Sequence, residues 1–359
     1  MSERGKYDYT LIVTLFLLVI TGLILLYSTS SYNGEVKFSD AFYYLKKQVF
    51  AVLLGIFGMI FVANTDYHRW EKLAIPAYLI SIALGIAVLL IGDEYNGSKR
   101  WLSLGPFSFQ PSEFAKVAVI LFLAHLVTKN VKKMKSLKTM IKVMILILPI
   151  VALVGASNLS TAIIILGIGA VLIFVASPKY AQFLIMGVLG IGFMAIFLAL
   201  ESYRLERLAI WRNPENYEKG YQTLQGLYAI GSGGLFGRGL GNSMQKLGFV
   251  PEAQNDMIFS IVCEELGLIG AGFILLLFLI MIWRFFVIAT HAKDLFGALI
   301  ATGAMAHMMI QVILNIAVVT NTIPNTGITL PFISYGGTSV VFLLMEMGLV
   351  LSVSAVLKY

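Results

Sequence analysis

The sequence predicts an all-α, polytopic integral membrane protein with about ten transmembrane helices. Hydrophobic residues make up 58% of the chain and charged residues only 13%, whereas soluble domains carry roughly 25% charged residues. Long apolar runs recur along the whole chain, and about 20 apolar residues form a helix that crosses the hydrocarbon core. Such runs must be helical, because lipid offers no hydrogen-bond partners to the backbone. We therefore expect a single membrane domain over residues 1–359.

Ten apolar runs are long enough to be transmembrane helices. In chain order they cover residues 9–28, 46–65, 73–92, 111–128, 139–157, 160–177, 180–201, 257–286, 295–319 and 334–357. Lysine and arginine are enriched on the cytoplasmic side of membrane proteins. The lysine cluster from Lys129 to Lys142 falls on the same side as the N-terminus. The pattern predicts that both termini are cytoplasmic.

The net charge of +7 does not indicate a nucleic-acid partner. The positive charges lie in short loops between apolar runs, where they set topology and contact anionic lipid. The single cysteine, Cys263, excludes an intrachain disulfide and a metal site built on several thiolates.

The longest polar segment, residues 202–256, follows the seventh predicted span and is expected on the extracytoplasmic side. Connections between helices usually have about 2–8 residues, and much longer ones are functional or disordered. This segment keeps aromatic and aliphatic residues, which predicts an ordered, partly helical loop. Two more outer loops, 93–112 and 320–338, are polar as well.

Glu113 and Lys116 begin the fourth span and are three residues apart, on one face of a helix. In one interpretation they form a local ion pair at a helix start that Ser112 caps. In the other, Lys116 faces an outer cavity and binds an anionic head group.

Arg204 and Arg207 also share a helical face, at the outer end of the seventh span. Arginine suits phosphate because its planar guanidinium bonds two oxygens and keeps its charge. The alternative is two arginines that reach the membrane interface from a span end. Their position on the outer side, against the usual bias of positive charge, favours phosphate binding.

The glycine-rich stretch 231–241 raises the question of a nucleotide-binding loop. No Gly-Lys-Ser or Gly-Lys-Thr follows it, so the phosphate-binding pattern is incomplete. The glycines predict tight turns and close backbone packing instead, and no nucleotide cofactor is expected.

Asp256 directly precedes the apolar run 257–286. It is either an N-cap of that helix or a general base at the membrane surface. Further polar residues lie inside the spans, and buried polar groups in membranes usually pair across helices. That pairing is the expected role of Glu264, Glu265, His307, Gln311, Asn315 and Glu346.

Three motifs resemble one family. Residues 105–116 read GPFSFQPSEFAK, and this stretch, 231–267 and 325–339 resemble signatures of the SEDS proteins, which are named for shape, elongation, division and sporulation. The resemblance covers essentially the whole chain. Residues 239–246 are more similar to the division and sporulation branch, FtsW and SpoVE, than to RodA. Gln254 and Asn255 depart from the family pattern, which often has His and Thr there.

The resemblance implies a peptidoglycan glycosyltransferase in the bacterial cell membrane that polymerises lipid II, an undecaprenyl-pyrophosphate-linked disaccharide-pentapeptide. It implies that Asp256 is catalytic. The residues that it implies in substrate binding are Arg100, Glu113, Lys116, Arg204, Arg207 and Glu252. A divalent cation, Mg²⁺ or Mn²⁺, is a candidate cofactor, and a class B penicillin-binding protein is the expected partner.

Two other functions compete with polymerisation. A lipid II flippase would need polar residues at the midplane, and the sequence offers His307, Gln311, Asn315 and the two glutamates Glu264 and Glu265. A non-catalytic scaffold would activate a penicillin-binding protein without needing Asp256. Charge concentrated at the outer face favours an outer-surface reaction over transport.

Overall fold

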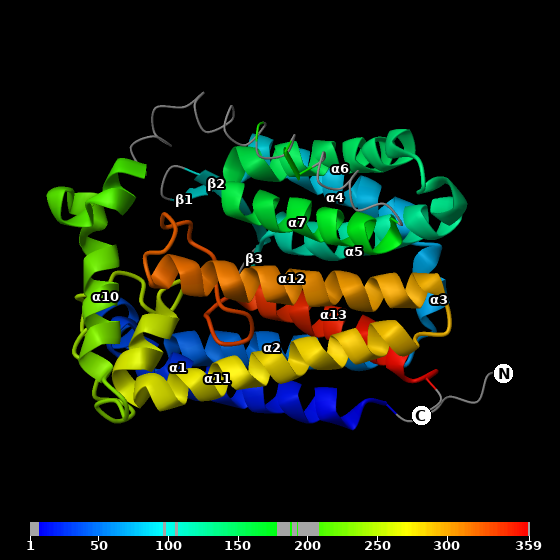
Figure 1. The fold of residues 1–359 in the computed structure, drawn as a ribbon. Coiled ribbons are helices and arrows are strands. Elements are labelled where there is room, and N and C mark those ends of the chain that lie inside the picture. The colour runs from blue at the N-terminus through cyan, green and yellow to red at the C-terminus, as the bar shows by residue number, and fades with distance from the viewer. Residues whose placement is uncertain are drawn as a thin grey trace.

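The computed structural model describes residues 7–95, 98–104, 107–177, 187–188, 192 and 208–357. Within this part of the chain, nine helices are long and apolar enough to cross a membrane. They are α1 (Tyr9–Phe38), α2 (Tyr43–Ala63), α4 (Ala74–Ile91), α5 (Pro111–Asn130), α6 (Leu137–Ser157), α7 (Leu159–Ala176), α11 (Ile258–His291), α12 (Leu295–Val319) and α13 (Gly337–Ser354) (Figure 1). Each matches a predicted span in position. The predicted seventh span, 180–201, lies almost entirely outside the described residues.

The start of α1 and the end of α13 lie at the same end of the helix bundle (Figure 1). The Asp8 backbone N–H donates to Ser354 Oγ at 3.3 Å, so the start of α1 meets the end of α13. The Asp8 carboxylate accepts from Leu11 N at 2.9 Å and pairs with Arg284 near the end of α11. This arrangement agrees with the even number of spans predicted. The count of ten and the orientation in the membrane stay predictions.

A small sheet departs from the all-helical prediction. Strands β1 (Asp93–Tyr95), β2 (Ser98–Leu104) and β3 (Phe107–Phe109) form an antiparallel sheet in the order β1-β2-β3. It lies at the end of the bundle away from the termini (Figure 1). Open sheet edges are excluded only from lipid, so a polar outer loop can form strands that hydropathy does not reveal.

The described part of the long outer segment is ordered and partly helical, as predicted. It contains two 3₁₀ turns, η2 (Pro214–Asn216) and η3 (Glu218–Gly220), followed by helix α10 (Tyr221–Gly233). Helix α10 runs across the end of the bundle, roughly at right angles to the spanning helices (Figure 1). Two short elements at other connections are α3 (Tyr67–Glu71) and η1 (Val131–Lys133).

Helix α11 is interrupted where the glycine-rich stretch packs against it. Its 34 residues would extend about 51 Å, well beyond a hydrocarbon core of about 30 Å. Gly267 breaks the helix with φ 67° and ψ −169°. The backbone of Gly237 comes so close that a Cβ there would lie 2.2 Å from Glu265 O. The prediction of close packing by these glycines is confirmed.

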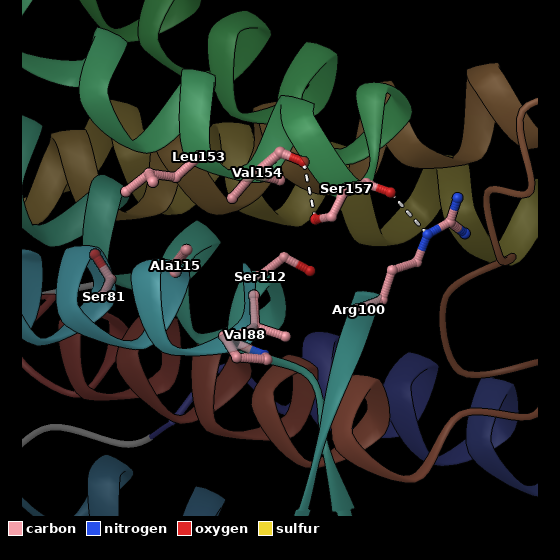
Figure 2. Close-up of a pocket in the computed structure, with 10 residues that line it drawn as sticks. Ser81, Val88, Arg100, Ser112, Ala115, Leu153, Val154 and Ser157 are labelled. Carbon is pink, nitrogen blue, oxygen red and sulfur yellow. Dashed lines mark hydrogen bonds between the residues drawn. The ribbon is translucent and has the colours of Figure 1, made fainter. Parts of the chain in front are cut away.

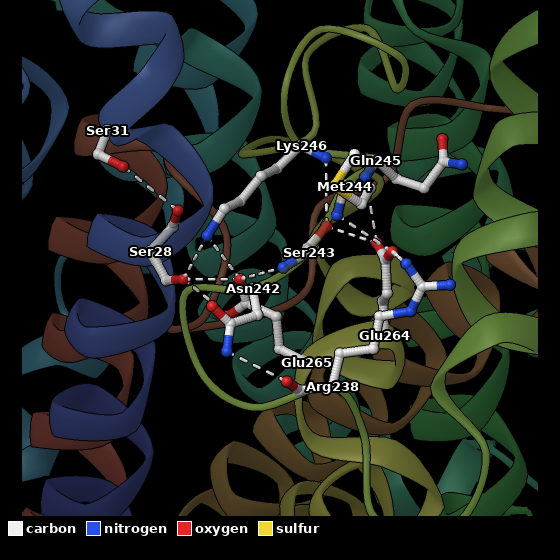
Figure 3. A network of polar contacts seen from close by, with 10 residues as sticks. All are labelled: Ser28, Ser31, Arg238, Asn242, Ser243, Met244, Gln245, Lys246, Glu264 and Glu265. Atoms are coloured by element: carbon white, nitrogen blue, oxygen red, sulfur yellow. Dashed lines mark hydrogen bonds and ion pairs between the residues drawn. The ribbon is translucent and has the colours of Figure 1, made fainter.

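A buried polar network holds the segment between α10 and α11 in place. We call this network the loop network, and its members are Ser28, Ser243, Lys246, Glu264 and Glu265 (Figure 3). Lys246 Nζ lies 2.7 Å from Glu265 Oε1, and Ser28 Oγ donates to the same carboxylate. Glu264 accepts from Ser243 Oγ and from the backbone N–H groups of Met244 and Gln245. The two glutamates therefore join the loop to α11 and α1.

Candidate active site

A cavity of about 1400 Å³ opens at the end of the bundle. Its walls come from α2, β2, α5, the segment before α11, and residues 325–342. Five of the predicted site residues line it: Arg100, Glu113, Lys116, Glu252 and Asp256. The structure thus brings together residues that are more than 150 positions apart in the chain. Arg204 and Arg207 lie outside the described residues.

Asp256 lies on the cavity wall with 9% of its surface exposed. The N-cap of α11 is Met257, and no side-chain cap hydrogen bond is made there, so the capping interpretation of Asp256 is wrong. Burial raises the pKa of the Asp256 carboxyl to about 6, the Glu252 charge adds to this shift, and Arg100 opposes it. A carboxylate with a pKa near neutrality is suited to act as a general base.

The segment that carries Asp256 is fixed from three sides. Asn315 Nδ2 on α12 donates to the Asp256 carbonyl at 2.9 Å. Asn33 Nδ2 on α1 donates to Gln254 Oε1 at 3.0 Å, and Tyr335 N donates to the Gln254 carbonyl at 2.9 Å. Asn255 Nδ2 donates to Glu252 Oε2 at 2.9 Å. The two positions that depart from the family pattern therefore support the loop around Asp256.

Lys116 and Glu113 form an ion pair at 3.0 Å, and both line the cavity. The two interpretations from the sequence, a local ion pair and a cation beside a cavity, are therefore compatible. Ser112 is not the helix cap, because α5 starts at Pro111 with Gln110 in the cap position. Lys116 is only 2% exposed, and burying a charge pair of this kind brings little or no net stability. The stability of the fold therefore does not by itself explain why Lys116 lies on the cavity wall.

Arg100 reaches from β2 to the end of α6, where its Nε donates to the Ser157 carbonyl at 2.9 Å (Figure 2). This contact fixes one edge of the guanidinium on the cavity wall. The effect of Arg100 on the pKa of Asp256 indicates that its positive charge acts at the same site.

Lys46, Lys47, Lys219 and Gln311 line the cavity as well, although none of them was predicted as a site residue. Lys46 and Lys47 have the same signal as Arg204 and Arg207, positive charge on the predicted outer side. Gln311 was expected to pair across helices or, in the alternative function, to support a flippase. Lys219 lies in a polar loop where its residue type gives no distinct signal.

The described part of the chain contains no group of three or more His, Cys, Asp or Glu residues that would hold a metal ion. Glu252 and Asp256 are two carboxylates on one cavity wall. Mg²⁺ is usually bound by one or two carboxylates together with phosphate oxygens of the substrate. The site therefore fits a cation that would bind together with a diphosphate, with Glu252 as its protein ligand.

The model of the FtsW/RodA/SpoVE family, described as cell cycle protein, matches residues 8–359. The chain belongs to this family. Among curated proteins, it is 40% identical to stage V sporulation protein E of Bacillus subtilis, with all of both chains covered. It is 35% identical to a probable peptidoglycan glycosyltransferase FtsW of Geobacter sp., with 99% of this chain and 98% of the relative covered.

Solved structures of FtsW/RodA/SpoVE proteins share the fold. A chain of a peptidoglycan synthase complex, studied for the coordination of polymerization and crosslinking, matches with a TM-score of 0.80 at 28% identity over 97% of both chains. The rod shape determining protein RodA of Thermus thermophilus matches with a TM-score of 0.71 at 28% identity, covering 97% of this chain and 96% of RodA. The SEDS resemblance is confirmed, and the SpoVE and FtsW relatives agree with the predicted branch.

Proposed function

We propose that this chain is a peptidoglycan glycosyltransferase that polymerises lipid II, in cell division or sporulation. One observation carries the proposal: Asp256, with a pKa of about 6, lies in the same cavity as the cations Arg100 and Lys116. A base beside positive charge is what transfer of a sugar from a diphosphate requires. The named relatives, SpoVE and FtsW, support the same activity.

In the proposed reaction, Asp256 accepts the proton of the acceptor GlcNAc 4-hydroxyl. The resulting oxygen nucleophile forms a bond to the anomeric carbon of the donor glycan. The bond from that carbon to the pyrophosphate oxygen breaks, undecaprenyl pyrophosphate leaves with the electron pair, and the anomeric centre inverts. General base catalysis of this kind contributes about 10²–10⁴-fold to the rate.

The leaving pyrophosphate gains negative charge as the bond breaks, and fixed positive charge stabilises it. Arg100 and Lys116 are the described residues that carry this role, and the sequence adds Arg204 and Arg207. A divalent cation, when bound with the diphosphate, supplies further neutralising charge. Glu252 is the carboxylate that would hold this cation, which would leave Asp256 free to act as the base.

The reaction belongs on the extracytoplasmic side in this proposal. Elements that line the cavity, among them β2, β3 and α10, lie at the end of the bundle opposite to the start of α1 and the end of α13 (Figure 1). With cytoplasmic termini, as the distribution of lysine and arginine predicts, the cavity faces outward. The enzyme would act at the outer surface of the bacterial cell membrane, with a class B penicillin-binding protein as partner. The peptidoglycan synthase complex among the similar structures supports such a partner.

The flippase alternative loses its main support. His307, Gln311 and Asn315 are engaged in hydrogen bonds with protein groups. Polar side chains committed in this way are poorly placed to accompany a head group across the membrane.

The test is polymerisation of labelled lipid II by the purified protein, with and without its cognate penicillin-binding protein. Asp256→Asn keeps the volume of the side chain and removes the base, so the rate should fall by about 10²–10⁴-fold. Asp66→Asn is the matched control, because Asp66 caps α3 at the far end of the bundle and Asn caps equally well.

Equal glycan from wild type and Asp256→Asn would exclude Asp256 as the base. Absence of glycan from wild type, even with the partner, would exclude polymerisation in favour of a scaffold or a flippase.

A further inference from the structure

Three polar residues on α12 form a ladder along one face of the helix. His307, Gln311 and Asn315 are four residues apart and so lie on the same side. All three are almost completely buried, with at most 2% of each exposed. Gln311 is the member of the ladder that also lines the cavity.

The hydrogen bonds of Gln311 fix the orientation of its amide. Lys116 Nζ, which can only donate, lies 3.1 Å from Gln311 Oε1. Gln311 Nε2 donates to the Thr329 carbonyl at 3.0 Å. A reversed amide would place two donors together at Lys116 and two acceptors together at Thr329. The oxygen of Gln311 therefore faces Lys116.

This orientation determines how His307 is protonated. His307 Nε2 lies 2.9 Å from the same Gln311 oxygen, which only accepts, so Nε2 carries a hydrogen. His307 Nδ1 lies 2.8 Å from Glu346 Oε2. That contact needs a second proton, on one atom or the other. The two side chains together hold this proton, and the pair has no net charge.

The five residues form what we call the cavity network: Glu113, Lys116, His307, Gln311 and Glu346. Glu113 balances the charge of Lys116, and Glu346 balances that of His307, so the network is neutral although it is buried. An ammonium has three N–H donors. Glu113 and Gln311 take two of them, and the third remains for a ligand, since Lys116 lines the cavity.

We infer that Gln311 is a positioning residue: it accepts a hydrogen bond from Lys116 and so fixes the Lys116 ammonium on the cavity wall. Gln311 is itself held by His307, which contacts Glu346. This inference rests on the proposed function, in which Lys116 meets the diphosphate of the substrate. Gln311 Oε1 is the shared acceptor of Lys116 and His307, so its position is fixed by a donor on each side. Without it, Lys116 would be held by Glu113 alone.

Two substitutions separate this role from a structural one. Gln311→Met removes the acceptor at similar volume, and kcat should fall about tenfold to a hundredfold, the usual cost of a misplaced catalytic group. Gln311→Glu, protonated in this neutral and buried network, keeps the acceptor for Lys116 and His307 and donates to the Thr329 carbonyl, so kcat should stay close to that of wild type. If Gln311 served only to hold the fold, Gln311→Met would lower the thermal stability but leave kcat per folded molecule unchanged, and the inference would be overturned.

The matched control is Thr302→Val. Thr302 is a buried residue of the same helix whose hydroxyl donates to the Ala298 carbonyl, and its loss should leave kcat unchanged.

A double-mutant cycle tests whether Gln311 acts through Lys116. In the charge-balanced background Lys116→Met with Glu113→Gln, the further change Gln311→Met should cost no more activity. A full additional loss would show that Gln311 acts on the substrate by itself, which contradicts a positioning role.

Affinity for undecaprenyl pyrophosphate, measured as thermal stabilisation of the purified protein, gives a readout that needs no turnover. Gln311→Met should raise the Kd about tenfold to a hundredfold, whereas Gln311→Glu should not. If wild type makes no glycan, the proposed function fails, but the inference is still decided by these values. Equal Kd values for wild type and Gln311→Met would overturn it.

Discussion

The protein buries two acid–base networks, and their surroundings differ. In the loop network, the oxygens of Glu264 and Glu265 accept from Ser28, Ser243, Lys246 and backbone N–H groups (Figure 3). Among described residues its members do not line the cavity. In the cavity network, Lys116 and Gln311 face the cavity, and Glu346 Oε1 accepts no hydrogen bond from the described residues. A fully paired network holds a loop, whereas an incompletely paired one beside a cavity is suited to bind a ligand.

The largest effect should come from breaking the loop network. Lys246→Met leaves the Glu265 charge buried without its cation, and such a loss costs about 3–5 kcal/mol of stability. Thermal unfolding of the detergent-solubilised protein measures it, with polymerisation per folded molecule expected to stay close to wild type. The control is Lys246→Met with Glu265→Gln, which removes both charges and should recover most of the stability. A double variant as unstable as the single one would contradict the explanation.

The opposite result is expected in the cavity network. Lys116→Met with Glu113→Gln removes both charges together, so the fold should be retained, but polymerisation should fall about 10²-fold, or about 3 kcal/mol in barrier height. Initial rates at saturating lipid II measure this loss. Normal activity in this variant would place Lys116 among structural residues, like Lys246, and remove the contrast between the two networks.

A smaller effect is expected when the polymerisation rate is measured against pH. It distinguishes Asp256 from Glu264 and Glu265, whose carboxylate oxygens all accept hydrogen bonds. The base works only when deprotonated, and its pKa is about 6. The rate should therefore fall as pH drops through 6, by about tenfold for each unit below it. The kcat/KM profile between pH 5 and 8 tests this, with unfolding followed at each pH. A flat profile with intact protein would exclude Asp256 as the titrating base.

The smallest effect is a gain in stability. The pKa of Asp256 is raised from 3.8 to about 6 in the folded protein, so its contribution to stability is complete below 3.8 and is lost as pH rises through 6. Asp256→Asn removes this buried charge and should therefore stabilise the protein at pH 8. The expected gain is only about 1 kcal/mol, because water in the cavity screens the charge. At pH 4 the gain should be absent. Thermal midpoints at the two pH values give the comparison, and destabilisation at pH 8 would contradict it.

The sequence predicted those features that depend only on consecutive residues along the chain. Hydropathy located the nine described spans, because a helix in lipid must be apolar over its full length. It missed the strands β1–β3, since their polar loop follows no membrane constraint. Residue type offered Ser112 and Asp256 as possible helix caps, but the structure has Gln110 and Met257 in the cap positions, because the start of a helix depends on where the preceding loop is held.

The site shows the same division at the level of single residues. Asp256, Lys116 and Glu113 were chosen from their residue types, their positions at span ends and the family motifs. Gln311 was not, because its importance comes from neighbours distant in sequence. Gln311 and Lys116 are 195 positions apart, yet their side chains lie 3.1 Å from each other.

By itself, the sequence determined that this is a helical membrane protein of the SEDS type, and it singled out the aspartate before the eighth predicted span as the candidate base. Those conclusions depend on composition and local motifs, which need no folding. Only the tertiary structure showed that Glu264 and Glu265 hold the segment before α11 in place. It also showed that Gln311 contacts Lys116 and is itself held by His307. Residue type is the same for a structural carboxylate and a functional one, and the difference lies in which donors the fold brings within hydrogen-bond distance.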